Sequence, residues 1–147
     1  MTHLQFIDGC VGPILCFFAT CLNRLSAHRS TVQPPRSLIF IKLSEQGATV
    51  LAAPALREAV RRVGRDRVFF VAFSGNREIL DLMDILPAEN VLELENRSVW
   101  SFLRSLLRLF GDFRRLRPEA AIDLDFFTRA SALLTWASGA SRRVGLH

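Results

Sequence analysis

The stretch "SLIFIKLSEQGATVLAAPALREAV", residues 37–60, decides the fold class of this chain. It opens with "SLIFIKL", an apolar run of β-branched and aromatic residues that is typical of a strand buried on both faces. A short polar turn that contains Gly47 follows, and apolar residues then recur at helical spacing. The stretch therefore predicts a buried strand that passes through one turn into a helix.

The same alternation continues to the end of the chain. Strands separated by helices imply right-handed crossovers and a parallel sheet. Pro54 either kinks the first helix or restarts it. We therefore predict a Rossmann-like, doubly wound α/β domain over residues 37–147, with strands at 37–43, 67–73, 90–94, 119–125 and 142–146 and helices at 48–63, 77–85, 98–116 and 128–138.

The longest predicted helix, 98–116, has apolar residues at helical spacing. Its apolar face is expected to pack on the sheet, and an arginine face opposite it is expected to be solvated. The predicted packing residues are Val99, Phe102, Leu103, Leu106, Phe110 and Phe113, and the solvated ones are Arg104, Arg108 and Arg115.

Residues 1–30 form a separate apolar and basic segment that contains an uncharged run at 9–22. The run is shorter than the roughly 20 residues that span a bilayer, and it lacks the preceding positive charge of a secretory signal. We expect a helix over 12–27, which either packs against the domain or lies as an anchor at the inner membrane interface. Residues 31–36, with two consecutive prolines, are predicted to be a linker.

Composition limits the classes of partner. The chain has 147 residues, 50% of them hydrophobic, and a net charge of +5 in which Lys42 is the only lysine. No basic block alternates with aromatic residues, so we expect no nucleic-acid partner. The chain has three cysteines, all within residues 10–21, and three histidines, and neither set has the spacing of metal ligands, so we predict no metal site. We also predict no cofactor and a reduced, cytoplasmic setting.

Ligands of doubly wound domains gather at the carboxyl ends of the strands, which here means the turns 44–49, 73–77 and 123–129. No glycine-rich phosphate fingerprint is present. Gly47 either exposes backbone amides to an anion or serves only the geometry of the turn. Glu45 is a candidate base, and Asp125 is expected either to reach the ligand or to cap the next helix. Arg129, Arg142 and Arg143 either bind an anionic acceptor or are simply solvated.

Two segments resemble the motifs of glycosyltransferase family nine, the bacterial lipopolysaccharide heptosyltransferase-like enzymes. The matching residues of the first are Lys42, Leu43, Ser44, Gly47 and 54–57 ("PALR"). Those of the second are Asp123, Arg129, Ser131, Ala132, Gly139, Ala140 and 142–145 ("RRVG"). The resemblance covers residues 37–147.

The resemblance implies a GT-B enzyme of two Rossmann-like lobes, of which this chain is the acceptor-binding N-terminal one, with the donor lobe absent. Such enzymes transfer a sugar, typically a heptose, from a nucleotide-diphosphate donor to an anionic glycolipid acceptor at the cytoplasmic membrane face. The implied substrate-binding residues are Ser44, Gln46, Gly47, Ala48, Thr49 and Arg129.

Ala48 departs from the family, which has an aspartate there as the general base. Glu45 or Asp125 is the candidate substitute, or else the protein binds without catalysing. The alternatives are therefore a transferase half, a non-catalytic binding or scaffold domain, and an unrelated doubly wound domain that binds a nucleotide or acts as a receiver. The receiver is disfavoured because the first strand lacks a terminal pair of acidic residues.

Overall fold

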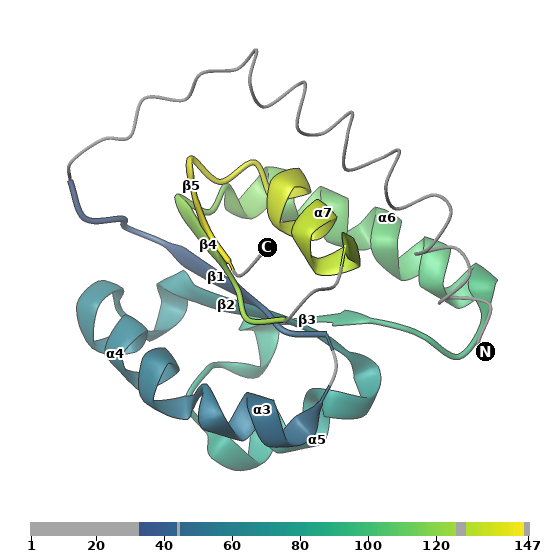
Figure 1. Cartoon of the computed structure of the whole chain (residues 1–147), viewed down its shortest axis with the longest axis horizontal. Coiled ribbons are helices and arrows are strands. Elements are labelled where there is room, and N and C mark those ends of the chain that lie inside the picture. Colours follow the sequence, from purple (N-terminus) through teal and green to yellow (C-terminus); the bar gives the residue numbers. More distant parts are fainter. Residues whose placement is uncertain (1–32, 44, 126–128, 146–147) are drawn as a thin grey trace.

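The computed structural model describes residues 33–43, 45–125 and 129–145. Within these residues, five strands form one all-parallel sheet in the order β3-β2-β1-β4-β5 (Figure 1). This confirms the predicted doubly wound parallel sheet, and the order of the strands reverses between β1 and β4. The strands are β1 (Leu38–Ile41), β2 (Val68–Phe73), β3 (Val91–Leu94), β4 (Ala120–Asp123) and β5 (Arg142–Val144).

Helices cover both faces of the sheet (Figure 1). One face carries α3 (Gln46–Leu51), α4 (Ala53–Val63) and α5 (Arg77–Met83), and the other carries α6 (Val99–Leu116) and α7 (Arg129–Ala137). The predicted first helix is divided at Ala52, and Pro54 lies in the first turn of α4, where its missing N–H costs no hydrogen bond. Pro54 therefore restarts the helix. Three short 3₁₀ turns complete the connections, at Arg65–Arg67, Ser74–Asn76 and Ala88–Asn90.

Two hydrophobic clusters lie on opposite faces of the sheet, because successive strand residues point to opposite sides. Phe40 and Phe70 pack with Leu56 of α4 on one face. Ile39 and Ile41 pack with Leu109 of α6 on the other. Every residue of β1 is buried, which explains why its sequence is continuously apolar rather than alternating.

The start of α6 differs from the prediction. Its buried residues are Ser105, Leu109 and Phe113, whereas Val99 and Leu103, predicted to pack on the sheet, are exposed. The Ser105 hydroxyl accepts a hydrogen bond from the backbone N–H of Glu95, directly after β3, at 3.0 Å. The turns of α6 before Ser105 therefore extend past the end of the strand, where there is no sheet to bury them.

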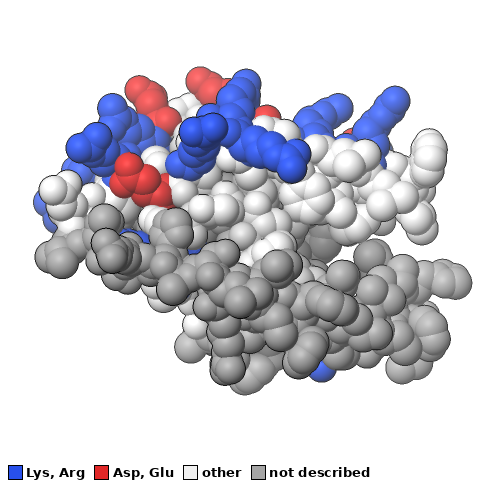
Figure 2. Space-filling view, turned by 90° about the horizontal axis from the view of Figure 1, so that it is seen from above, with Lys and Arg blue, Asp and Glu red and all other residues white. Residues whose placement is uncertain are grey.

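Charged side chains are unevenly distributed over the surface. Figure 2 shows Lys and Arg side chains gathered along one edge of the face that it presents, with Asp and Glu side chains interspersed among them. The expected helix at 12–27 lies outside the described residues, and so does the choice between packing and a membrane anchor. Residues 33–36 form neither helix nor strand. Across the described ranges, none of the helices combines the length and the apolar character that a bilayer span requires.

Candidate functional site

A buried ion pair joins the ends of β1 and β4. The ammonium Nζ of Lys42 lies 2.6 Å from Oδ1 of Asp125, and each side chain is 2% exposed. The other carboxylate oxygen of Asp125 accepts the backbone N–H of Leu43 at 2.9 Å. The two residues meet because β1 and β4 are parallel neighbours, with Ile41 opposite Asp123 in the register. The pair therefore marks the point where the strand order reverses, the usual ligand position in such sheets.

Asp123 and Asp125 are directed to different partners. Oδ1 of Asp123 accepts the backbone N–H of Asp125 at 3.0 Å, and Oδ2 accepts the hydroxyl of Ser131 in α7 at 2.9 Å. Both carboxylates are buried. Asp123 therefore fixes the end of β4 to α7, while Asp125 fixes the same end to the turn after β1.

Glu45 is the carboxylate of this region that reaches solvent. Its side chain is 69% exposed, and its Oε2 lies 3.2 Å from Nζ of Lys42. Its backbone φ is 67°, a sparsely populated value for a residue other than glycine. The Glu45 carbonyl accepts both the backbone N–H and the hydroxyl of Thr49, at 3.2 and 3.3 Å, so the start of α3 holds this conformation. Unusual backbone of this kind is concentrated at functional sites.

The turn after β2 closes against the same region. The buried side chain of Asn76 donates its amide to the backbone oxygen of Leu43 at 3.1 Å. That oxygen also accepts the N–H of Phe73 at 3.2 Å. The side chain of Gln46 donates to the backbone oxygen of Gly75 at 2.8 Å. Three turns that are distant in the sequence are thus joined at one edge of the sheet. Below, the switch-point cluster denotes Lys42, Glu45, Asn76, Asp123 and Asp125.

The cluster keeps Lys42 charged. Burial lowers the pKa of Lys42, but its hydrogen bonds to Asp125 and Glu45 together outweigh burial and raise the pKa above its ordinary value. A lysine that acts as a base or nucleophile needs the opposite shift. Lys42 is therefore a fixed cation that orients the two carboxylates.

The predicted binding residues fall into different environments. Gly47 lies in α3 with open space where a side chain would extend, and Ala48 beside it is partly buried. Thr49 is fully buried and holds the turn rather than facing a ligand. Arg129 is exposed at the first residue of α7. Ser44 lies outside the described residues.

Two contributors were not singled out as site residues from the sequence. Lys42 entered only through the family resemblance, although a lone charge at the end of a buried apolar run already demands a partner. Asn76 gave no signal beyond its place in the turn 73–77.

Arg142 and Arg143 lie opposite the start of β4 in the register, away from the edge that carries the cluster. In the described part of the chain, no group of three or more His, Cys, Asp or Glu side chains could hold a metal ion.

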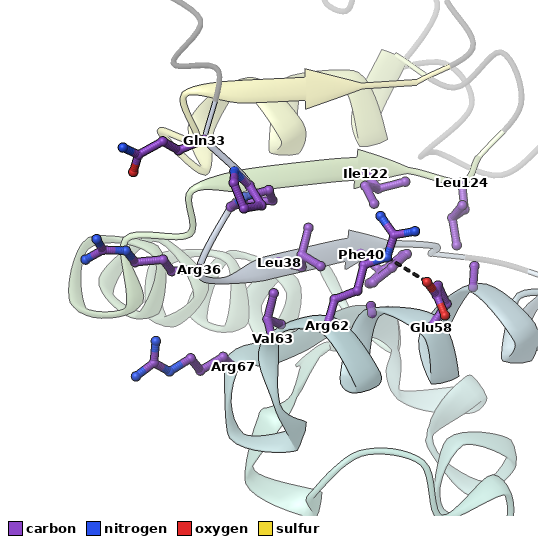
Figure 3. Close-up of a pocket in the computed structure, with 14 residues that line it drawn as sticks. Gln33, Arg36, Leu38, Phe40, Glu58, Arg62, Val63, Arg67, Ile122 and Leu124 are labelled. Atoms are coloured by element: carbon purple, nitrogen blue, oxygen red, sulfur yellow. Dashed lines mark hydrogen bonds and ion pairs between the residues drawn. The ribbon is translucent and has the colours of Figure 1, made fainter.

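A hollow of about 840 Å³ lies elsewhere, on the α4 face of the sheet (Figure 3). Apolar side chains of the sheet line it, among them Phe40, Ile122 and Leu124. At its rim Arg62 donates a hydrogen bond to Glu58 at 2.6 Å. No residue of the switch-point cluster lines this hollow, so the two features are separate.

Comparisons of this chain with protein-family models, with curated proteins and with solved structures find no match.

Proposed function

We propose that this chain is the acceptor-side half of a glycosyltransferase-like protein. The transferred sugar is of the heptose type, its donor is a nucleotide-diphosphate sugar, and its acceptor is lipopolysaccharide or another anionic cell-envelope glycolipid. The sequence resemblance over residues 37–147 and the Rossmann-like sheet support this proposal. The observation that carries it is the solvent-facing carboxylate of Glu45, held beside a buried ion pair where the strand order reverses.

In this proposal Glu45 takes the proton from the acceptor hydroxyl as its oxygen attacks the anomeric carbon of the sugar. The nucleoside diphosphate then leaves with the bonding electron pair. General-base assistance is worth about 10²- to 10⁴-fold. The geometry favours Glu45 over Asp125 because both oxygens of Asp125 already accept hydrogen bonds in a buried position. Lys42 and Asp125 are positioning residues.

A second candidate function is non-catalytic binding of the same acceptor. The contact between Glu45 and Lys42 favours it, because this ion pair already engages one of the two carboxylate oxygens of Glu45. Ala48, where the family has its aspartate, favours it as well. Both candidates place the acceptor at the same edge of the sheet, in a cytoplasmic protein that associates peripherally with the inner membrane.

Acceptor binding tests what the two candidates share. A soluble phosphorylated core oligosaccharide from lipopolysaccharide is titrated into the ¹⁵N-labelled chain, with a neutral maltooligosaccharide as the control. We expect amide shifts confined to residues 42–49 and 73–77 with the charged oligosaccharide alone. The absence of shifts with either sugar contradicts both candidates.

A transfer assay with a radiolabelled nucleotide-diphosphate heptose separates the two when the chain is joined to a donor-binding lobe. Labelled product that the Glu45→Gln variant fails to make supports catalysis, provided that the variant still binds the oligosaccharide. Acceptor binding without product in the joined wild-type protein supports the binding domain.

A further inference from the structure

The outer side of α6 exposes a row of large apolar residues. Trp100 is 82% exposed and Leu107 is 71% exposed, and Val99 and Leu103 are also exposed beside them. These residues recur at a spacing of three and four, so they lie on one side of the helix. Single exposed apolar residues are ordinary, but a contiguous row on one helix marks a contact surface.

Arginines form a second row beside the apolar one. Arg104 and Arg108 are one helical turn apart, and within the described ranges neither has a carboxylate within ion-pair distance. Arg115 continues the row and pairs with Asp112, the only acidic residue of α6, at 3.3 Å. A small hollow of about 250 Å³ lies beside the arginine row, lined by Trp100, Arg104 and Arg108 together with Glu95, Ser98, Ser101 and Ser105.

We propose that this side of α6, with Val99, Trp100, Leu103, Leu107, Arg104 and Arg108, docks on an anionic lipid bilayer. The interface of such a bilayer accepts Trp and Leu side chains at the level of the headgroups, and its phosphates pair with arginine. This inference needs no transfer activity, but it rests on the peripheral membrane association that the proposed function includes.

Charge argues against two other occupants of this surface. Residues 1–36 contain one acidic residue, Asp8, against Arg24, Arg29 and Arg36, so this segment cannot neutralise the arginines of α6. A second copy of the chain, packed α6 against α6, would bring arginines against arginines. An anionic bilayer accommodates both rows, because its interface takes up the apolar side chains and its phosphates pair with the arginines.

The position of the surface relates it to the switch-point cluster. Val99, Trp100 and Leu103 lie in the first turns of α6, which extend past the carboxyl end of β3. The cluster lies at the same edge of the sheet, at the carboxyl ends of β1 and β4. Docking through α6 therefore brings this edge close to the lipid headgroups.

The experiment measures vesicle binding of the full chain by flotation and by fluorescence. The chain has two tryptophans, so a Trp136→Phe background leaves Trp100 as the only reporter. With phosphatidylcholine vesicles that contain phosphatidylglycerol, we expect flotation and a blue shift of Trp100 emission. With phosphatidylcholine alone we expect neither.

Paired variants assign the binding to α6. Leu107→Ser is expected to lower the partition coefficient about tenfold. The Arg104→Gln/Arg108→Gln double variant is expected to lower it about fivefold for each arginine removed. The matched controls are Leu82→Ser on α5, whose leucine is 80% exposed, and Arg61→Gln/Arg62→Gln on α4; both should bind as the wild type does.

Three results would overturn the inference. The first is equal binding of the α6 variants and their controls. The second is loss of binding on deletion of residues 1–30 while the α6 variants bind as wild type, which assigns the anchor to that segment. The third is a lipid-free dimer, measured by light scattering, that Leu107→Ser dissociates, which assigns the surface to a second copy.

Discussion

The ammonium of Lys42 and the carboxylate of Asp125 lie 2.6 Å apart in the buried interior, although 83 positions separate the two residues in the sequence. The pair joins the turn after β1 to the end of β4. Charges are costly to bury, and a partner with good geometry offsets that cost. The carboxyl edge of the sheet is therefore pre-organised, with Glu45 directed to solvent beside the pair.

Removal of one partner should destabilise the fold strongly. We expect Asp125→Asn to lower the free energy of unfolding by about 3 kcal/mol, because it leaves a buried cation with incomplete compensation. The loss stays at the low end of the usual range because Lys42 keeps its contact with Glu45. Urea denaturation measures the change.

The control for this prediction is Asp81→Asn, which breaks the more exposed pair with Arg77 and should cost less than about 1 kcal/mol. Lys42→Met should cost less in the Asp125→Asn background than in the wild type. Additive effects of the two substitutions would show that the pair is not coupled.

Stability should depend on the charge of Lys42 at alkaline pH. The pKa of Lys42 is raised in the folded state, so its contribution is fully present below the unfolded pKa of about 10.4 and is lost as pH rises through the folded value. The chain has no tyrosine and one lysine, so few other groups titrate in this range.

We therefore expect the free energy of unfolding to fall above about pH 10.4 in the wild type. The fall should be smaller in Lys42→Met, measured by urea denaturation at a series of pH values. In chain labelled with ¹³C-lysine, the single lysine signal should titrate above the value of the unfolded chain. A lower titration point is incompatible with the pair.

Asn76 should contribute modestly to the link between the turns. Asn76→Ala removes the hydrogen bond to the Leu43 carbonyl, but that oxygen keeps the N–H of Phe73. We expect a loss of about 1 kcal/mol, since no buried acceptor is left without a partner. The comparison variant is Gln46→Ala, in the exposed bond to Gly75, for which thermal unfolding should differ little from wild type. A loss of several kcal/mol for Asn76→Ala would mean that Asn76 has a larger structural role than its contact indicates.

The sheet could be predicted from the sequence because its strands are marked by local composition. The continuous apolar run of β1 follows from burial of both faces, and the turn residues separate it from α3. Packing at the start of α6 could not be predicted in this way. Helical spacing gives the same signal for Leu103, which is exposed, as for Phe113, which is buried. The spacing does not say where the neighbouring strand β3 ends, and hence which turns of α6 meet the sheet.

The candidate site was predictable in position but not in detail. Gly47 and the strand ends indicated the edge of the sheet, and Glu45 and Asp125 were both named as candidate bases. Which of them faces solvent depends on Lys42, whose partner is distant in the sequence and is brought close only by the pairing of β1 with β4.

The central claim is that the acceptor binds at the switch-point cluster. The most direct test compares the ¹⁵N-detected titrations of the wild type and of Glu45→Gln. We predict shifts at residues 42–49 and 73–77 with the phosphorylated core oligosaccharide in both proteins, and none in either protein with the neutral maltooligosaccharide. Shifts confined to other parts of the sheet, such as the hollow beside α4, would contradict the account.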